Sequence, residues 1–269
     1  MDNRPIGVYD SGLGGLSVWR ELCRLLPHES IVYLGDGKNC PYGGRSREEI
    51  TEFAKASVER LVDEGVKMVV VGCNTATTAA IATLREIWHD MPIVGLEPAV
   101  KPACLGTKSG RIAVLATAHS LQSDMFLSTT ARYAEGVEVM KVVGEGFVDL
   151  VEAGKEGSEE AHEAVRRVVE PLLDSKVDKI VLGCTHYPFL RPHIEAIVEG
   201  LGIDIVDSGE AVARRVEWLL KRYKIAARSD HKPEYRFISF ADEDYRAAME
   251  QRGGKILNEV KTERLKLKS

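Results

Sequence analysis

The sequence predicts an α/β protein of two pseudo-symmetric lobes, each a mostly parallel sheet flanked by helices. Short, wholly apolar runs alternate with longer amphipathic stretches along nearly the whole chain. Such runs are typical of strands that are covered by helices on both faces. The second observation is a likeness between segments 69–75 and 180–186. Each is an apolar strand followed by Gly, Cys and two polar residues, which indicates a duplicated lobe.

The first half of the chain supplies three strands and three helices. The expected strands are 6–9, 31–34 and 68–71, and the expected helices are about 15–26, 46–62 and 76–89. Ser46 and Glu49 have the spacing of a capping box at the start of the second helix. Behind this box the apolar side chains recur at helical spacing, which predicts one buried helix face.

The second half repeats this plan. Strands are expected at 112–115 and 180–182, and Ser158 and Ser208 are expected to cap helices with apolar stripes. A strand at 235–240 and a terminal helix end the chain. We place the lobe boundary near Glu97, so that residues 1–97 plus 208–269 form the first lobe and 98–207 the second.

The amino-acid composition and net charge limit the classes of partner and location expected for this protein. The 269 residues are 44% hydrophobic and 29% charged, as in an ordinary globular protein, and the net charge is −5. An acidic balance does not favour nucleic acid or an anionic membrane as a partner. No apolar run approaches the roughly 18 residues of a membrane span, and no leader precedes the first strand. We therefore expect a cytoplasmic protein.

The cysteines are odd in number and widely spread: Cys23, Cys40, Cys73, Cys104 and Cys184. None forms a CxxC pair, so the sequence predicts no metal site, and free buried thiols are the default. A single cysteine in a strand–helix unit is usually structural. Cys73 and Cys184 differ because the same placement occurs twice, at strand ends where open α/β sheets bind ligands. A following helix N-terminus lowers the pKa of a thiol there.

The segment 10–15, Asp-Ser-Gly-Leu-Gly-Gly, has more than one interpretation. Gly12-x-Gly14 before a helix, with Asp36 further on, resembles a dinucleotide-binding loop. Ser17 at the third glycine position, and Asp10 where a pyrophosphate would lie, count against this. A carboxylate at a strand end suits an ammonium group or a thiol better, and a simple helix cap at Asp10 remains the alternative.

Four further places carry polar groups of interest. The turn-rich stretch around Tyr42 could present Gly43 N–H to an anion. His186, two residues after Cys184, could accept a proton or stabilise a thiolate. Glu152 could be a solvated helix residue or a supporting base, and Thr117 at a strand end could bind a carboxylate.

Together these motifs resemble the glutamate racemases of the aspartate/glutamate racemase superfamily. The shared motifs are Asp-Ser-Gly-x-Gly-Gly-Leu at 10–16, Pro-Tyr-Gly at 41–43, Gly-Cys-Asn-Thr-Ala at 72–76 and Gly-Cys-Thr-His-Tyr-Pro at 183–188. They occur in the family's order and spacing. The resemblance implies an active site in a cleft between the lobes, and racemisation of L-glutamate to D-glutamate without cofactor, for peptidoglycan.

The resemblance also implies the roles of particular residues. Cys73 and Cys184 match the two catalytic thiols, Asp10 and His186 the groups that assist them, and Glu152 a further assisting carboxylate. The positions that match substrate contacts are Asp10, Ser11, Pro41, Tyr42, Gly43, Asn74, Thr75, Thr117, Thr185 and His186. A homodimer that binds small-molecule glutamate is expected.

The chain departs from the family's usual pattern at several positions. Gly144-Glu145 stands where many members have Cys-Pro, which leaves the wall near Glu152 uncertain. Ser120 and Phe126 replace a Thr and a Tyr, and Gly37 replaces a common Thr.

Three other functions would share part of the pattern. An aspartate racemase of the same superfamily would keep both cysteines, but its first motif would normally read differently. A nucleotide-dependent oxidoreductase would use the glycine loop and leave the twin Gly-Cys segments unexplained. A two-lobed amino-acid-binding protein would not need the thiols.

Overall fold

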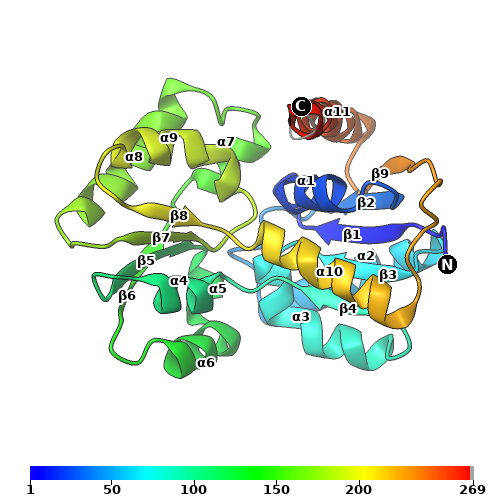
Figure 1. Cartoon of the computed structure of the whole chain (residues 1–269), viewed down its shortest axis with the longest axis horizontal. Coiled ribbons are helices and arrows are strands. Elements are labelled where there is room, and N and C mark those ends of the chain that lie inside the picture. Colours follow the sequence, from blue (N-terminus) through cyan, green and yellow to red (C-terminus); the bar gives the residue numbers. More distant parts are fainter. Residues whose placement is uncertain (267–269) are drawn as a thin grey trace. The chain divides into compact units, whose positions relative to one another are not determined.

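A computed structural model describes residues 1–266, which divide into two compact units. The first unit comprises residues 1–96 and the chain from Gly209 onward, and the second comprises Glu97–Ser208. Each unit contains one fully parallel sheet with helices packed on it (Figure 1). The predicted α/β class is confirmed.

The sheet of the first unit has the order β4-β3-β1-β2-β9. Its strands are β1 (Ile6–Asp10), β2 (Ile31–Gly35), β3 (Met68–Val71), β4 (Ile93–Gly95) and β9 (Tyr235–Ser239). Every residue of β1, β2 and β3 is buried, which explains why these strands have no polar alternation. The C-terminal strand β9 pairs in parallel with β2 and forms one edge.

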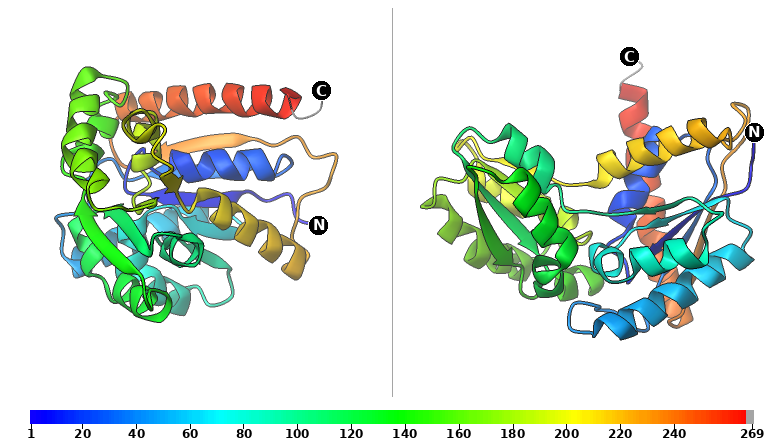
Figure 2. Two further views of the ribbon diagram at one scale, coloured as in Figure 1. Left: turned by 60° about the vertical axis from the view of Figure 1, so that its left-hand side comes forward. Right: turned by 90° about the horizontal axis from the view of Figure 1, so that it is seen from below.

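Helices cover both faces of this sheet. They are α1 (Leu16–Leu25), α2 (Arg47–Asp63), α3 (Asn74–Ile87), α10 (Gly209–Tyr223) and α11 (Glu243–Lys266). α1 packs against α10 and α11, whereas α2 packs against α3 on the opposite side (Figure 2). Trp19 of α1 lies with its ring centre 5.5 Å from the rings of both Tyr235 and Phe237, so α1 and β9 share one aromatic core.

Two helix starts show how the local sequence sets the boundaries. The predicted capping box is confirmed, because Glu49 N donates to Ser46 Oγ at 3.2 Å and Ser46 N donates to Glu49 Oε2 at 2.9 Å. α3 begins two residues before the predicted Ala76. Cys73 itself is the N-cap, and its sulfur accepts the Ala76 N–H at 3.4 Å.

The sheet of the second unit has the order β6-β5-β7-β8. Its strands are β5 (Arg111–Ala116), β6 (Glu138–Val143), β7 (Lys179–Leu182) and β8 (Asp204–Val206). Its helices are α4 (Val100–Gly106), α5 (Ala118–Gln122), α6 (Asp124–Tyr133), α7 (Phe147–Glu152), α8 (Glu159–Leu173) and α9 (Arg191–Val198). Alternate residues of β5 enter two separate apolar clusters, so this sheet too is buried on both faces.

The second Gly-Cys segment has the expected helix after its two polar residues, but this helix begins as a 3₁₀ helix. A 3₁₀ helix, η1 (Tyr187–Leu190), lies between β7 and α9. Proline has no N–H to donate, and this segment contains Pro188 and Pro192, so a regular α-helix cannot start from Cys184 as it does from Cys73. Over residues 1–266, no helix is both long and apolar enough to cross a membrane.

A buried ion pair closes the end of the first unit opposite the carboxyl ends of the strands. Lys67 Nζ lies 2.5 Å from Glu29 Oε2, with side-chain exposures of 0% and 5%. Lys67 also donates to the carbonyl of Asp2 at 2.6 Å, and Glu29 Oε1 accepts Ala227 N–H at 2.8 Å. The pair therefore joins the N-terminal segment to the connection between α10 and β9.

Replacing Lys67 by Met is expected to lower the free energy of unfolding by about 3–5 kcal/mol, because the buried carboxyl group of Glu29 would lose the cation that pairs with it. Urea unfolding measures this change. The matched control is Lys55→Met, which removes an exposed pair with Glu52 and should cost less than about 1 kcal/mol. Equal decreases in the free energy of unfolding of the two variants would show that the buried pair stabilises the protein no more than the exposed pair does.

Candidate active site

In each unit the candidate residues gather at the carboxyl ends of the two central strands. From β1 the chain proceeds to β2 on one side of the sheet and later to β3 on the other. Asp10 ends β1 and Cys73 follows β3, so both lie at the topological switch point of the first sheet. In the second unit Thr117 follows β5 and Cys184 follows β7, which are again the two neighbouring central strands. Open α/β sheets bind their ligands at this place.

The glycines before the two cysteines have equivalent environments. Gly72 N–H donates to the carbonyl of Tyr9 at 2.6 Å, and Gly183 N–H donates to the carbonyl of Leu115 at 2.7 Å. A β-carbon on Gly72 would lie 3.2 Å from that same Tyr9 oxygen, and one on Gly183 would lie 3.1 Å from the Leu115 oxygen. Both positions thus need glycine because the neighbouring strand approaches so closely.

Cys73 is held by its own helix and by the first loop. The residue is 4% exposed, and its thiol donates to Ser11 Oγ across 3.6 Å while the sulfur accepts Ala76 N–H. The sulfur therefore lies against the N-terminus of the long helix α3, whose free N–H groups favour negative charge. This surrounding suits a thiol that becomes a thiolate during a reaction.

Asn74, next in the chain, carries an unsatisfied polar group. The residue is 3% exposed, and its amide nitrogen Nδ2 has no hydrogen-bond partner among residues 1–266. Such a buried donor costs about 1–3 kcal/mol unless something accepts its hydrogen bond. A ligand oxygen beside Cys73 would satisfy it.

The carboxylate of Asp10 shapes the loop that follows β1. Its Oδ2 accepts Gly12 N–H at 2.9 Å, and the N-cap of α1 is Gly15. The alternative of Asp10 as a helix cap is therefore wrong. Gly15 is needed here, since a β-carbon on it would lie 2.5 Å from the β-carbon of Asp10.

A buried hydrogen-bond chain holds the loop that contains Pro41, Tyr42 and Gly43. Tyr9 OH donates to Tyr42 OH at 2.8 Å, and Tyr42 OH donates to Asp36 Oδ2 at 2.6 Å. Burial is the main cause that raises the pKa values of Tyr9 and Tyr42, so both phenols keep the protons they donate. Burial also raises the pKa of Asp36, against the hydrogen bonds from Tyr42 and Asn39 that lower it.

These hydrogen bonds decide whether Asp36 belongs to a dinucleotide-binding loop or supports the loop of residues 41–43. In a dinucleotide-binding loop the acidic residue must be accessible to a ribose hydroxyl. Here Asp36 is fully buried and accepts hydrogen bonds from Tyr42 OH and from Asn39 Nδ2 at 2.9 Å. The dinucleotide interpretation is therefore not supported. Sequence reasoning did not identify Tyr9 as part of the loop's support, because a Tyr in a strand looks like any core residue.

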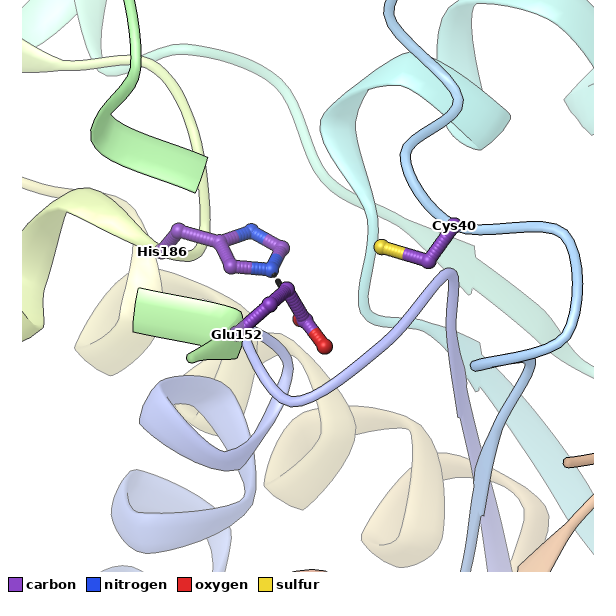
Figure 3. Close-up of side chains that lie close together, drawn as sticks. All are labelled: Cys40, Glu152 and His186. Carbon is purple, nitrogen blue, oxygen red and sulfur yellow. Dashed lines mark hydrogen bonds and ion pairs between the residues drawn. The ribbon is translucent and has the colours of Figure 1, made fainter. Parts of the chain in front are cut away.

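In the second unit, Cys184, His186 and Glu152 form a connected row. His186 Nδ1 lies 3.7 Å from Cys184 Sγ. On its other side, His186 Nε2 lies 2.6 Å from Glu152 Oε1, as the dashed line in Figure 3 marks. Glu152 is the last residue of α7, and His186 is 2% exposed. A carboxylate on Nε2 favours the tautomer with the proton at that nitrogen, so that Nδ1 can accept a proton from the thiol.

The departure at Gly144 has a local structural reason. A β-carbon there would lie 2.6 Å from Tyr187 OH and 2.7 Å from a ring carbon of Phe147. Tyr187 OH donates to the Gly144 carbonyl at 3.3 Å, and burial raises its pKa well above normal, with the neighbouring Cys184 as a second cause. Glu152 still reaches His186, so the altered wall leaves this pair intact.

The remaining predicted contacts have mixed environments. Thr117 is the N-cap of α5, accepting Ser120 N–H at 3.2 Å and donating to Ser120 Oγ at 3.0 Å. Thr75 and Thr185 are buried beside the two cysteines. Cys23 and Cys104 lie within α1 and α4, and burial raises the pKa of Cys104, as expected for structural thiols.

Comparison with known proteins identifies the family. The model of the Asp/Glu/Hydantoin racemase family matches residues 14–216. The chain belongs to this family. A glutamate racemase from Herpetosiphon aurantiacus is 49% identical over 220 residues, which is 82% of this chain and 86% of that protein.

Solved structures of the family agree in fold. The glutamate racemase of Escherichia coli in complex with L-glutamate and the activator UDP-MurNAc-Ala has a TM-score of 0.82 and 33% identity, covering 93% of this chain and 95% of that one. The glutamate racemase of Francisella tularensis in complex with D-glutamate has a TM-score of 0.80 and 28% identity, covering 96% and 95% of the two chains.

Proposed function

We propose that this protein interconverts L- and D-glutamate by proton transfer at the α-carbon, with Cys73 and Cys184 as two separate acid–base groups. The observation that carries the proposal is the repeated strand–Gly–Cys placement at the switch points of both sheets. The glutamate racemases among its relatives and structural neighbours support glutamate as the substrate.

Two thiols suit this reaction because inversion requires one group on each face of the carbon. One enters as a thiolate and removes the proton, and the other enters as a thiol and returns one. The ordinary thiol pKa of about 8.5 needs only a modest change to serve both roles near neutral pH. Since the acid and the base both come from the chain, we propose that the reaction uses no cofactor.

The surrounding residues would bind and stabilise the substrate. Negative charge develops towards the α-carboxylate as the proton leaves, and hydrogen-bond donors placed there lower the barrier. Asn74 Nδ2, which is buried and has no partner in the described part of the chain, is one such donor. We assign substrate contacts also to Asp10, Ser11, Pro41, Tyr42, Gly43, Thr75, Thr117, Thr185 and His186.

We further propose that the product is D-glutamate for peptidoglycan, and thus for cell-wall biogenesis and cell shape, and that the enzyme is a cytoplasmic homodimer. The family assignment supports the role in making D-glutamate for peptidoglycan. Sedimentation of the purified protein measures whether it is a homodimer.

The purified protein should racemise L-glutamate in D₂O with deuterium entering the α-position, because the returning proton comes from a thiol that exchanges with solvent. NMR follows loss of the α-proton signal, and polarimetry follows inversion. The rate should survive dialysis against a chelator and should not rise with added pyridoxal phosphate or NAD. Faster exchange with aspartate than with glutamate would favour an aspartate racemase, and tight binding without exchange would favour a binding protein.

A further inference from the structure

α11 packs on the carboxyl end of β2 and on the neighbouring strand β9 through a row of residues four apart. Tyr245 lies over Gly37, Met249 lies over Gly35, and one turn further Gly253 lies under the ring of Phe237. The spacing of four residues places all three contacts on one face of the helix. Met249 is fully buried, so this face is a true packing surface.

The contact at Gly37 is the closest to the candidate site. A β-carbon on Gly37 would lie 2.4 Å from two ring carbons of Tyr245 and 2.7 Å from a third. No side chain fits there unless the ring moves. Gly37 directly follows Asp36, whose carbonyl accepts Asn39 N–H at 3.2 Å and whose carboxylate holds Tyr42. The ring of Tyr245 thus occupies the base of the loop that presents Pro41, Tyr42 and Gly43.

Tyr245 is itself held in place from both directions. Its N–H donates to Asp242 Oδ1 at 2.9 Å at the start of α11. Upstream, Ser239 Oγ donates to the carbonyl of Gly35 at 2.9 Å and accepts Ala241 N–H at 3.0 Å. The segment between β9 and α11 is therefore attached to the end of β2, which fixes the backbone from which the Tyr245 side chain extends.

We propose that Tyr245 is a positioning residue, whose ring replaces a side chain on the loop and fixes residues 37–43 for substrate binding. The resemblance to the family makes Thr the common residue at position 37, where this chain has glycine. The space that a side chain of the loop would fill is here filled from α11. Gly37 and Tyr245 are then a compensating pair, because the loop keeps its position with a glycine at 37 only when the ring of Tyr245 fills the space of the missing side chain.

The inference rests on the proposed function for its kinetic test, and a double-mutant cycle provides that test. Gly37→Thr should displace the ring, Tyr245→Ala should remove it, and each should raise the KM for glutamate on the order of tenfold by misplacing the loop. The double variant should return to within about threefold of the parent, since the Thr side chain then fills the vacated space. Tyr245→Phe keeps the ring and should behave as the parent.

Two further measurements separate positioning from general packing. Ile256→Ala removes a buried contact of α11 in a later helical turn and should lower the melting temperature without changing KM. Hydrogen exchange of the amides of 37–44 should accelerate in Gly37→Thr and Tyr245→Ala and recover in the double variant. If Gly37→Thr does not fold, Tyr245→Ala compared with Tyr245→Phe decides the matter.

An unchanged KM and unchanged exchange in Tyr245→Ala, with a melting temperature lowered as in Ile256→Ala, would overturn the proposal. The proposal would also be overturned if the KM changes of Gly37→Thr and Tyr245→Ala multiplied in the double variant. If the parent protein does not racemise glutamate, the proposed function fails, whereas the exchange measurement still decides whether Tyr245 positions the loop.

Discussion

Cys73→Ser and Cys184→Ser should each reduce racemisation about 10²–10⁴-fold in both directions, the range that one acid–base group contributes. A serine hydroxyl has a pKa far above any working pH, so it is neither a thiolate base nor a matched acid. Because the equilibrium constant of a racemase is one, kcat/KM must fall equally for L- and D-glutamate in each variant. Circular dichroism of the two enantiomers measures both rates.

The two variants should nevertheless differ in a reaction that needs only one proton abstraction. A 3-chloro analogue of glutamate can lose its α-proton and then chloride, without any proton being returned. We expect Cys73→Ser to retain elimination from the L-enantiomer through Cys184, and Cys184→Ser to retain elimination from the D-enantiomer through Cys73. Cys104→Ser, which changes a buried thiol inside α4, is the control and should retain racemisation. The same enantiomer preference in both active-site variants would show that the cysteines are not a pair of opposed bases.

The sequence predicted the central strands β1, β2, β3, β5 and β7 because nearly all of their residues are buried and therefore read as unbroken apolar runs. The edge strands β4, β6 and β8 were not predicted, since β4 and β8 have only three residues each and no residue of β6 is fully buried. The environment of Cys73 was also predictable, since its strand, glycine and helix follow one another directly along the chain. The same pattern at Cys184 predicted a helix after Thr185 and His186, but not that it begins as the 3₁₀ helix η1. Pro188 and Pro192 remove the N–H groups on which a regular α-helix would depend, and η1 forms in its place.

What the sequence could not reveal depends on contacts between distant segments. The Tyr9–Tyr42–Asp36 chain joins the ends of β1 and β2 to a loop, and no local pattern marks a strand tyrosine as its donor. Gly37 was visible as a departure, but Tyr245, which occupies its missing side-chain space, lies in the last helix. Pairs of this kind follow from packing geometry rather than from periodicity.

The largest effect outside the cysteines should come from His186. Its imidazole lies between the Cys184 sulfur at 3.7 Å and the Glu152 carboxylate at 2.6 Å, so it can hold the proton that the thiol releases. His186→Asn removes that acceptor, and kcat should fall on the order of 10²-fold or more. Glu152→Gln should cost about 10–100-fold, because the amide still contacts the imidazole but no longer fixes its tautomer and charge.

The structure makes this effect specific to one thiol. Cys73 belongs to the first unit, where it contacts Ser11 and the start of α3, whereas His186 and Glu152 belong with Cys184 to the second unit. With the 3-chloro analogue, His186→Asn and Glu152→Gln should therefore slow elimination from the L-enantiomer, which Cys184 starts, and leave elimination from the D-enantiomer near the parent rate. Asp149→Asn, an exposed change on the same helix α7, is the matched control and should slow neither. Adding Glu152→Gln to His186→Asn should cost little more, since the carboxylate acts through the imidazole. Equal slowing of both enantiomers would mean that the pair supports the fold of the second unit and not the chemistry of Cys184.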